Sequence, residues 1–314
     1  MNKDRIALTL MNKKQKLYIL VVILLLVYVN LNLFIKIGWA YTQWNDIQIY
    51  ADLNYYQDNK DTEEVLQYSP EMKAHLLDIY RPKSCYCCPV MVYVHGGTWV
   101  LGDKGGLSYK AKAFTAAGFI YISINYRLSP DYSFPAQAYD VARAFSWIRN
   151  NIADYGGNPE QIYLLGHSAG GHLAALIALD ERYLSAFDLN PSVIAGVIGL
   201  DSAAYHLPSL FAAEPENQYL FSWAFGDNPV DWETASPINY IREGQIVPPF
   251  LLLVAGDREV SKIVNNNFYQ HLSQYNYDAT IFYIEEKDHV SIDYDLGKEG
   301  DPVFQVILNW LKRP

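Results

Sequence analysis

The chain has 314 residues, of which 51% are hydrophobic and 18% are charged, so it can bury a large core and is not a disordered protein. Its formal net charge is -10, and no cluster of Lys and Arg occurs beyond the first 16 residues, which argues against nucleic-acid binding. This length is compatible with a single α/β domain.

The N-terminal residues predict a membrane anchor. Residues 1–16 carry five basic side chains and the single acid Asp4, whereas residues 17–35 carry no charge. As a helix, this uncharged run would be roughly 28 Å long, close to the thickness of the hydrocarbon core of a bilayer. Basic residues on one side predict that the N-terminus stays in the cytoplasm. We therefore expect a cytoplasmic segment at 1–16, a transmembrane signal-anchor at 17–36 and a stalk at 37–72.

The same segment has features of a cleavable signal peptide, which is the alternative. The small residues Gly38 and Ala40 flank Trp39 in an acceptable cleavage site, and cleavage would give a secreted protein. The uncharged run exceeds the usual length of about 7–15 residues for such a peptide, which favours the uncleaved anchor. In both cases the rest of the chain is predicted to be exported, to the periplasm or another extracytoplasmic space.

Three cysteines lie close together at positions 85, 87 and 88. Outside the cytoplasm two of them can pair, and Cys85 with Cys88 is the favoured pair because a bridge between the neighbours Cys87 and Cys88 would be strained. Three unpaired loop thiols are the alternative. No further ligands at suitable spacing lie nearby, so we expect no metal site here and no catalytic role.

From about residue 73 the sequence alternates between strands and helices. An early antiparallel strand is expected at 74–82. Further strands are expected at 89–97, 119–128, 161–168, 193–203, 248–257 and 279–289, with helices at 136–156, 169–180, 261–275 and 302–313. This order predicts an α/β domain over 73–314, with a mostly parallel sheet covered by helices on both faces. The aromatic-rich segment 204–247 is either a cap over the site or a surface insertion.

Residues 166–170 read Gly-His-Ser-Ala-Gly and lie between a predicted strand and a predicted helix. This matches the G-x-S-x-G turn, which holds a serine in a strained conformation with its hydroxyl above the sheet. Side chains two residues before and two after the serine would collide with the turn, which explains both glycines. We predict that Ser168 is a nucleophile; the alternative is a glycine-rich packing turn.

The segment His95-Gly96-Gly97-Thr98-Trp99 follows an earlier predicted strand. Acyl transfer builds negative charge on a carbonyl oxygen, and backbone N–H groups placed beforehand stabilise that charge. We expect an oxyanion hole formed by the N–H groups of Gly96, Gly97 and Ala169, with Thr98 as a further candidate.

An acid is needed to orient a histidine base. Asp257 ends an apolar run after Gly256, and we predict that it has this role. Glu259 is a nearby rival, and Asp201 at the end of the 193–203 run is a less favoured one. Asp257 could instead cap the helix that begins near Ser261.

Of the seven histidines, only His271 and His289 lie beyond the predicted acid; His271 falls within a predicted helix, whereas His289 comes at the end of a predicted strand. The order Ser168, Asp257, His289 is the order of nucleophile, acid and base that accompanies the G-x-S-x-G turn. His289 is therefore the predicted general base. His167 and His172, which flank the turn, are interpreted as packing or polar support.

The part of the chain from about residue 73 to the end resembles an α/β-hydrolase of the esterase/lipase type. The resemblance is carried by 95–99, 125–162, 166–172, 255–257 and 288–289. Within that superfamily the chain resembles carboxylesterases similar to hormone-sensitive lipase and enzymes similar to kynurenine formamidase. The His-Gly-Gly-x-Trp form and the C-terminal residues 288–311 are closer to the formamidase-like and feruloyl-esterase-like branch. Thr98 stands where a lipase-type loop more often has a third glycine.

These observations predict a serine hydrolase that cleaves esters of small or aromatic substrates through an acyl-enzyme, with no metal or organic cofactor. The expected partners are a small-molecule ester or amide and the membrane, through residues 17–36. One alternative is an amide or N-formyl hydrolase similar to arylformamidase. Another is a catalytically inactive, tethered binding module, which the presence of Ser168 and His289 disfavours. The sequence predicts no oligomeric state.

Overall fold

A computed structural model describes residues 46–56, 73–106 and 109–313. An eight-stranded sheet runs through this part of the chain in the order β1-β2-β4-β3-β5-β6-β7-β8. The strands are β1 (Ile47–Asn54), β2 (Leu76–Pro82), β3 (Cys88–Val94), β4 (Ile120–Ile124), β5 (Gly157–His167), β6 (Gly196–Leu200), β7 (Phe250–Ala255) and β8 (Ala279–Ile284). β2 pairs antiparallel with β1 and β4, and all other pairs are parallel. The predicted, mostly parallel sheet is confirmed.

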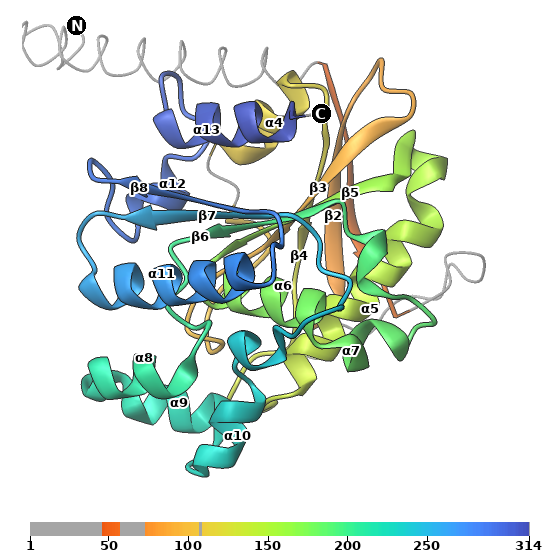
Figure 1. The fold of residues 1–314 in the computed structure, drawn as a ribbon. Helices are drawn as coiled ribbons and strands as arrows, with labels where there is room; N and C mark the ends of the chain where they lie inside the picture. Colours follow the sequence, from red (N-terminus) through yellow and green to blue (C-terminus); the bar gives the residue numbers. More distant parts are fainter. Residues whose placement is uncertain (1–45, 57–72, 107–108, 314) are drawn as a thin grey trace, which may run out of the picture. The chain divides into compact units, whose positions relative to one another are not determined.

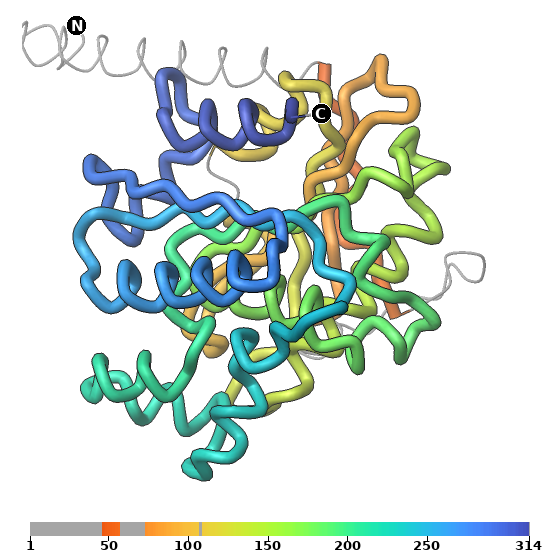
Figure 2. The backbone as a smooth tube through the Cα atoms, in the orientation of Figure 1, coloured from red at the N-terminus to blue at the C-terminus, as the bar shows by residue number. Residues whose placement is uncertain are grey.

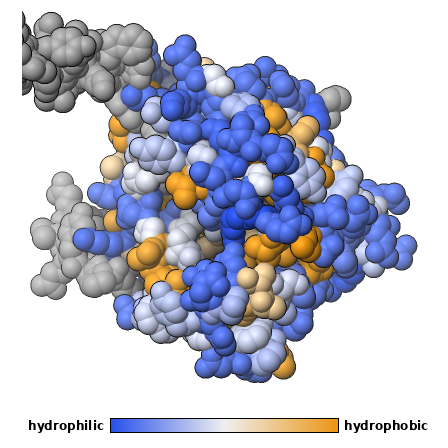
Figure 3. Space-filling model, turned by 90° about the vertical axis from the view of Figure 1, so that its left-hand side faces the viewer, coloured by the Kyte–Doolittle hydropathy of each residue, from blue (hydrophilic) through white to orange (hydrophobic). Residues whose placement is uncertain are grey.

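The central strands are continuous apolar runs because both faces of the sheet are covered. Every residue of β6 and of β7 is buried. The carboxyl ends of the parallel strands share one edge of the sheet, where loops can bring distant residues together. Figure 3 views this edge and shows a largely hydrophilic surface with a few apolar patches.

Helices lie on both faces of the sheet (Figure 1). One face carries α5 (Ala136–Asn151), α6 (Ala169–Leu179), α7 (Glu181–Ser185) and α11 (Glu259–Gln274). The other carries α4 (Lys110–Ala116) and α13 (Pro302–Leu311), which contact each other through rings of Phe114 and Phe304 that are 5.1 Å apart. All residues of α6 are buried, which explains why its sequence is apolar on every side.

Between β6 and β7 the chain leaves the sheet and forms a helical insertion, residues 204–247. It contains α8 (Leu207–Ala213), α9 (Gln218–Phe225) and α10 (Pro229–Thr234), which Figure 2 shows as a lobe beside the sheet domain. Phe211 and Phe221 stack within it at 4.4 Å. The insertion is tied to the core by a hydrogen bond from Phe134 N–H to Ala224 O of 2.8 Å.

Some elements differ from the sequence predictions. The stalk expected at 37–72 is wrong in its middle part, because Ile47–Asn54 forms β1 at the edge of the sheet. Most of its side chains remain outside the core, so its polar composition hides the strand. The short helices α4 and α12 (Ser291–Tyr294) are additional elements.

The expected anchor at 17–36 lies outside the described residues and stays a prediction. None of the helices in the described ranges has the length and apolar character needed to cross a membrane. A disulfide links Cys85 to Cys88, the favoured pair, and Cys87 is exposed and free. Such a bridge is typical of proteins outside the cytoplasm.

Candidate active site

Ser168 lies on the turn between β5 and α6 with φ 52° and ψ -117°. Such a conformation costs a non-glycine residue on the order of 1–3 kcal/mol, so the surrounding structure must hold it. A Cβ atom on Gly166 would lie 2.4 Å from the carbonyl carbon of Gly170, and one on Gly170 would lie 2.0 Å from Val94 O. The N–H of Ser168 donates to Leu200 O at 3.0 Å. This is the strained turn that the G-x-S-x-G pattern predicts.

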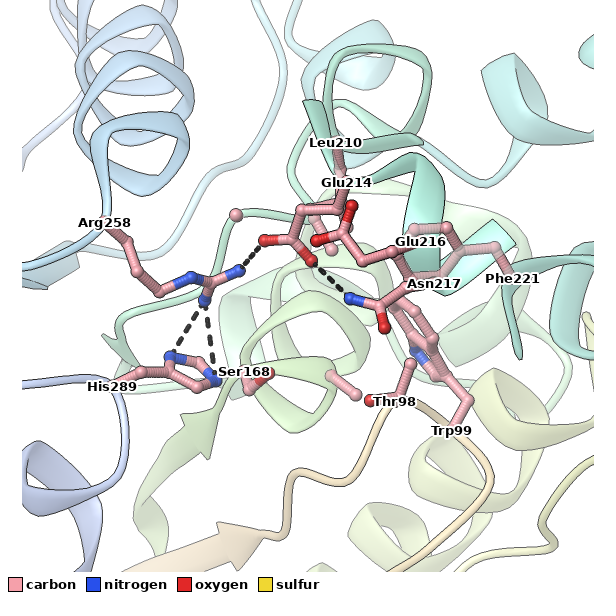
Figure 4. A pocket seen from close by; sticks show the side chains of 13 residues that line it. Thr98, Trp99, Ser168, Leu210, Glu214, Glu216, Asn217, Phe221, Arg258 and His289 are labelled. Atoms are coloured by element: carbon pink, nitrogen blue, oxygen red, sulfur yellow. Dashed lines mark hydrogen bonds and ion pairs between the residues drawn. The ribbon is translucent and has the colours of Figure 1, made fainter. Parts of the chain in front are cut away.

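Ser168 faces a pocket of about 320 Å³ at the carboxyl edge of the sheet (Figure 4). The loops of the sheet domain contribute Thr98, Trp99, Ala169, Arg258 and His289 to its wall. The insertion contributes Leu210, Glu214, Glu216, Asn217 and Phe221. The insertion therefore forms one wall of the pocket that contains the candidate nucleophile.

His289 lies on the loop after β8, and its ring is held in a defined orientation. Its Nδ1 is 2.6 Å from Oδ2 of Asp201, and its backbone carbonyl lies 2.8 Å from Nε2 of His167. An ionised carboxylate only accepts hydrogen bonds, so Nδ1 carries a proton. In the neutral ring the lone pair is then on Nε2, which lies 3.5 Å from Nη1 of Arg258. Figure 4 shows the imidazole facing Ser168. A ring in this tautomer can take the proton of the serine hydroxyl.

Asp201 directly follows β6 and is completely buried. Its Oδ1 accepts hydrogen bonds from the N–H of Ala255, at 3.0 Å, and from the hydroxyl of Ser261. Burial alone would raise the pKa of this carboxyl group. The hydrogen bonds with His289, Ser261 and the N–H of Ala255 outweigh burial and lower the pKa, so the group is a charged carboxylate at neutral pH.

The prediction that Asp257 orients His289 is wrong on this geometry. The side chains of Asp257 and Glu259 are exposed, and Asp201 occupies the place beside the imidazole. Both aspartates follow neighbouring parallel strands and both precede His289, so the order of residues along the chain does not separate them. Asp201 continues its strand, with its N–H donating to Leu253 O at 2.7 Å, whereas Gly256 separates Asp257 from β7. An acid that directly continues a buried strand is the signal that could have distinguished the two.

Arg258 is a site residue that the sequence analysis missed. One guanidinium nitrogen, Nη1, lies 2.9 Å from Nδ1 of His289 and 3.5 Å from Oδ2 of Asp201. The proton on Nδ1 is already donated to Asp201, so the guanidinium lies against the ring without a hydrogen bond to that nitrogen. Its Nη2 donates to Glu214, whose other oxygen accepts from Asn217 at 3.1 Å (Figure 4). Arg258 thus links the acid beside His289 to the insertion.

The loop after β3 lies beside the nucleophile turn. A Cβ atom on Gly96 would be 3.2 Å from Cβ of Ser168, so the two backbones are in close contact. Thr98, whose φ is 54°, and Ala169 line the pocket. The structure thus places two of the expected donor residues, Gly96 and Ala169, beside Ser168, with Thr98 on the pocket wall, whereas a Cβ atom on Gly97 would face Leu101. Among the described residues, no group of three or more His, Cys, Asp or Glu side chains is arranged to hold a metal ion.

His172 on α6 is expected to make the fold sensitive to acid. It is completely buried, and burial lowers its pKa from 6.5 to about 4. Between these two values the unfolded chain binds a proton that the folded protein does not, so the free energy of unfolding falls as the pH is lowered. The expected loss is about 3 kcal/mol from this residue alone. His172→Asn should flatten the pH dependence of urea unfolding between pH 6.5 and 4; an unchanged slope would contradict this.

The sequence of this chain is similar to those of known proteins. The sequence matches the BD-FAE family over residues 77–274. It is 36% identical to Esterase LipQ of Mycobacterium tuberculosis over 206 residues, which are 60% of this chain and 47% of LipQ. It is 41% identical to Carboxylesterase NlhH of the same species over 91 residues, 29% of this chain and 28% of NlhH. The matches therefore span less than half the length of these relatives.

Among solved structures, Esterase B from Lactobacillus rhamnosis has a similar fold. The TM-score is 0.66 at 17% sequence identity, and the alignment covers 91% of this chain and 93% of that chain. At this identity the likeness shows the α/β-hydrolase fold alone.

Proposed function

This chain belongs to the BD-FAE family, and we propose that it is a serine hydrolase that cleaves carboxylic esters of small molecules. The observation that carries the proposal is that Ser168 and His289 line one pocket, with the buried carboxylate of Asp201 behind the imidazole at 2.6 Å. A strained serine, an imidazole and a buried carboxylate are the three groups of a triad that activates a hydroxyl for attack on a carbonyl. The names of LipQ and NlhH as esterases support an ester as the scissile bond.

In the proposed mechanism, His289 Nε2 takes the hydroxyl proton of Ser168 while Oγ attacks the carbonyl carbon of the ester. Asp201 keeps the proton on Nδ1 and stabilises the imidazolium that forms. His289 then gives the proton to the leaving alcohol, which leaves an acyl-enzyme on Ser168. Water, activated by the same imidazole, hydrolyses that intermediate.

The negative charge on the carbonyl oxygen would be held by main-chain N–H groups of Ala169 and of the 96–98 loop. Each such donor is typically worth about 10²–10³ in rate, because it is in place before the charge develops. This assignment is part of the proposal, and it is supported by the position of Ala169 and Thr98 on the pocket wall beside Ser168.

The pocket is small, and its walls differ in polarity. Trp99, Leu210 and Phe221 provide apolar surface for a short acyl or an aromatic group, whereas Glu214 and Asn217 provide hydrogen-bonding groups. A volume of about 320 Å³ lies at the lower end of the range for small-molecule sites. We therefore propose small or aromatic esters as substrates.

Steady-state turnover of the protein without residues 1–40 tests this proposal. We expect hydrolysis of p-nitrophenyl acetate and butyrate, a loss of kcat/KM for acyl chains too long for the pocket, and slow or no hydrolysis of N-formylkynurenine. Faster turnover of the formamide than of the aryl esters would instead identify an amide hydrolase. Absence of turnover in the folded protein, together with no labelling by a fluorophosphonate, would indicate an inactive binding module.

A further inference from the structure

The loop that follows β3 has an energetically unfavourable backbone. Gly97, Thr98 and Trp99 have φ angles of 116°, 54° and 60° in succession. A left-handed conformation costs the two non-glycine residues on the order of 1–3 kcal/mol each, so contacts outside the loop must hold it in place. This loop is the one to which the proposed mechanism assigns oxyanion donors.

The side chain of Trp99 provides such a contact. It is 2% exposed, and its indole Nε1–H donates to Nδ1 of His172 at 3.1 Å. The other ring nitrogen of His172, Nε2, lies 2.7 Å from the carbonyl oxygen of Ala235 in the insertion, so it carries the proton. One neutral imidazole therefore accepts from the loop and donates to the insertion.

His172 is also fixed relative to the nucleophile. It lies one helical turn after Ser168, and its backbone N–H donates to Ser168 O at 3.1 Å. The indole of Trp99 packs edge-to-face against Phe225 of α9 at 4.7 Å. The loop, the nucleophile turn and the insertion thus meet at this one pair of side chains.

We propose that Trp99 and His172 are positioning residues that hold the oxyanion loop at the correct distance from Ser168. The inference rests on the proposed function, since it assumes that the loop binds the oxyanion. The bond between the two side chains keeps the strained turn in one conformation. Loss of this hydrogen bond loosens the N–H donors of the loop. Binding of the transition state is then weakened more than binding of the substrate.

Trp99→Phe, His172→Phe and the double variant test the pair. Trp99→Phe keeps an aromatic ring but removes the N–H donor. We expect kcat for p-nitrophenyl acetate to fall by about tenfold or more in each single variant, with a smaller change in KM. The affinity for a boronic acid that forms a tetrahedral adduct on Ser168 should fall in the same proportion. The double variant should be no worse than the poorer single variant, because both changes remove the same bond.

Trp147→Phe is the matched control. Trp147 is also buried, but among the described residues its indole nitrogen has no hydrogen-bond partner. Its replacement should leave kcat and boronic acid affinity within about twofold of the wild type. His172→Asn, whose side-chain oxygen can occupy the place of Nδ1 and accept from Trp99, should recover most of the activity that His172→Phe loses.

Equal kinetics for Trp99→Phe and Trp147→Phe, or additive losses in the double variant, would overturn the inference. If Trp99→Phe does not fold, the comparison of His172→Asn with His172→Phe decides it: no recovery of kcat in the Asn variant would contradict the inference. These outcomes presuppose ester turnover by the wild-type protein. Absence of that turnover would refute the proposed function itself.

Discussion

Ser168→Ala is expected to lower kcat for p-nitrophenyl acetate by about 10⁴-fold or more, because it removes the proposed nucleophile and prevents an acyl-enzyme. The fold should persist, since alanine fits the space of serine and the hydroxyl has no structural hydrogen bond to replace among those described around the turn. Substrate binding should change little. Steady-state kinetics measures the loss, and thermal unfolding checks the fold.

Ser185→Ala provides the matched control for this substitution. Ser185 lies at the end of α7 on the surface, where its hydroxyl donates only to the nearby Arg182 O. Activity within about twofold of wild type is expected. Retention of most of the wild-type activity by Ser168→Ala would mean that another group performs the reaction.

Asp201→Asn is expected to lower kcat by about 10³–10⁴-fold. The amide has no negative charge with which to stabilise the imidazolium of His289. It also no longer fixes the proton of the imidazole on Nδ1. Oδ2 of Asp201 lies 2.6 Å from that nitrogen, so the substitution acts directly on the proposed general base. KM should change much less than kcat, because Asp201 is buried behind the ring and does not line the pocket wall described above.

Asp257→Asn is the matched control, because the same chemical change is made at the end of the neighbouring strand. Its side chain is exposed, so kcat should stay within about twofold of wild type. The reverse result, with Asp257→Asn inactive and Asp201→Asn active, would show that Asp257 is the triad acid and that the pairing seen here is not the functional one.

The features that the sequence predicted are those with strong local signals. Buried parallel strands such as β7 are continuous apolar runs, and the glycines around Ser168 are required by close contacts within a few residues of the turn. His289 could be found because it was the one histidine after both an acid and a late strand. The first two signals are each contained in a short stretch of chain, and the third follows from the order of residues along it.

The features that the sequence missed depend on contacts between distant segments. The choice between Asp201 and Asp257 depends on which strand end lies beside the loop of His289, 88 residues after Asp201. The contact of Arg258 with Glu214 joins residues 44 positions apart, and neither belongs to a recognised motif. β1 was missed for a different reason, since an edge strand needs few apolar residues.

Reaction of the folded protein with a fluorophosphonate, followed by peptide mass spectrometry, tests the proposed triad most directly. Such a probe phosphonylates only a serine whose hydroxyl is activated by a neighbouring base. We predict one adduct, on Ser168, with its formation greatly slowed by Asp201→Asn and unaffected by Asp257→Asn. An adduct on another residue, or none on Ser168 in a protein that hydrolyses esters, would contradict the mechanism.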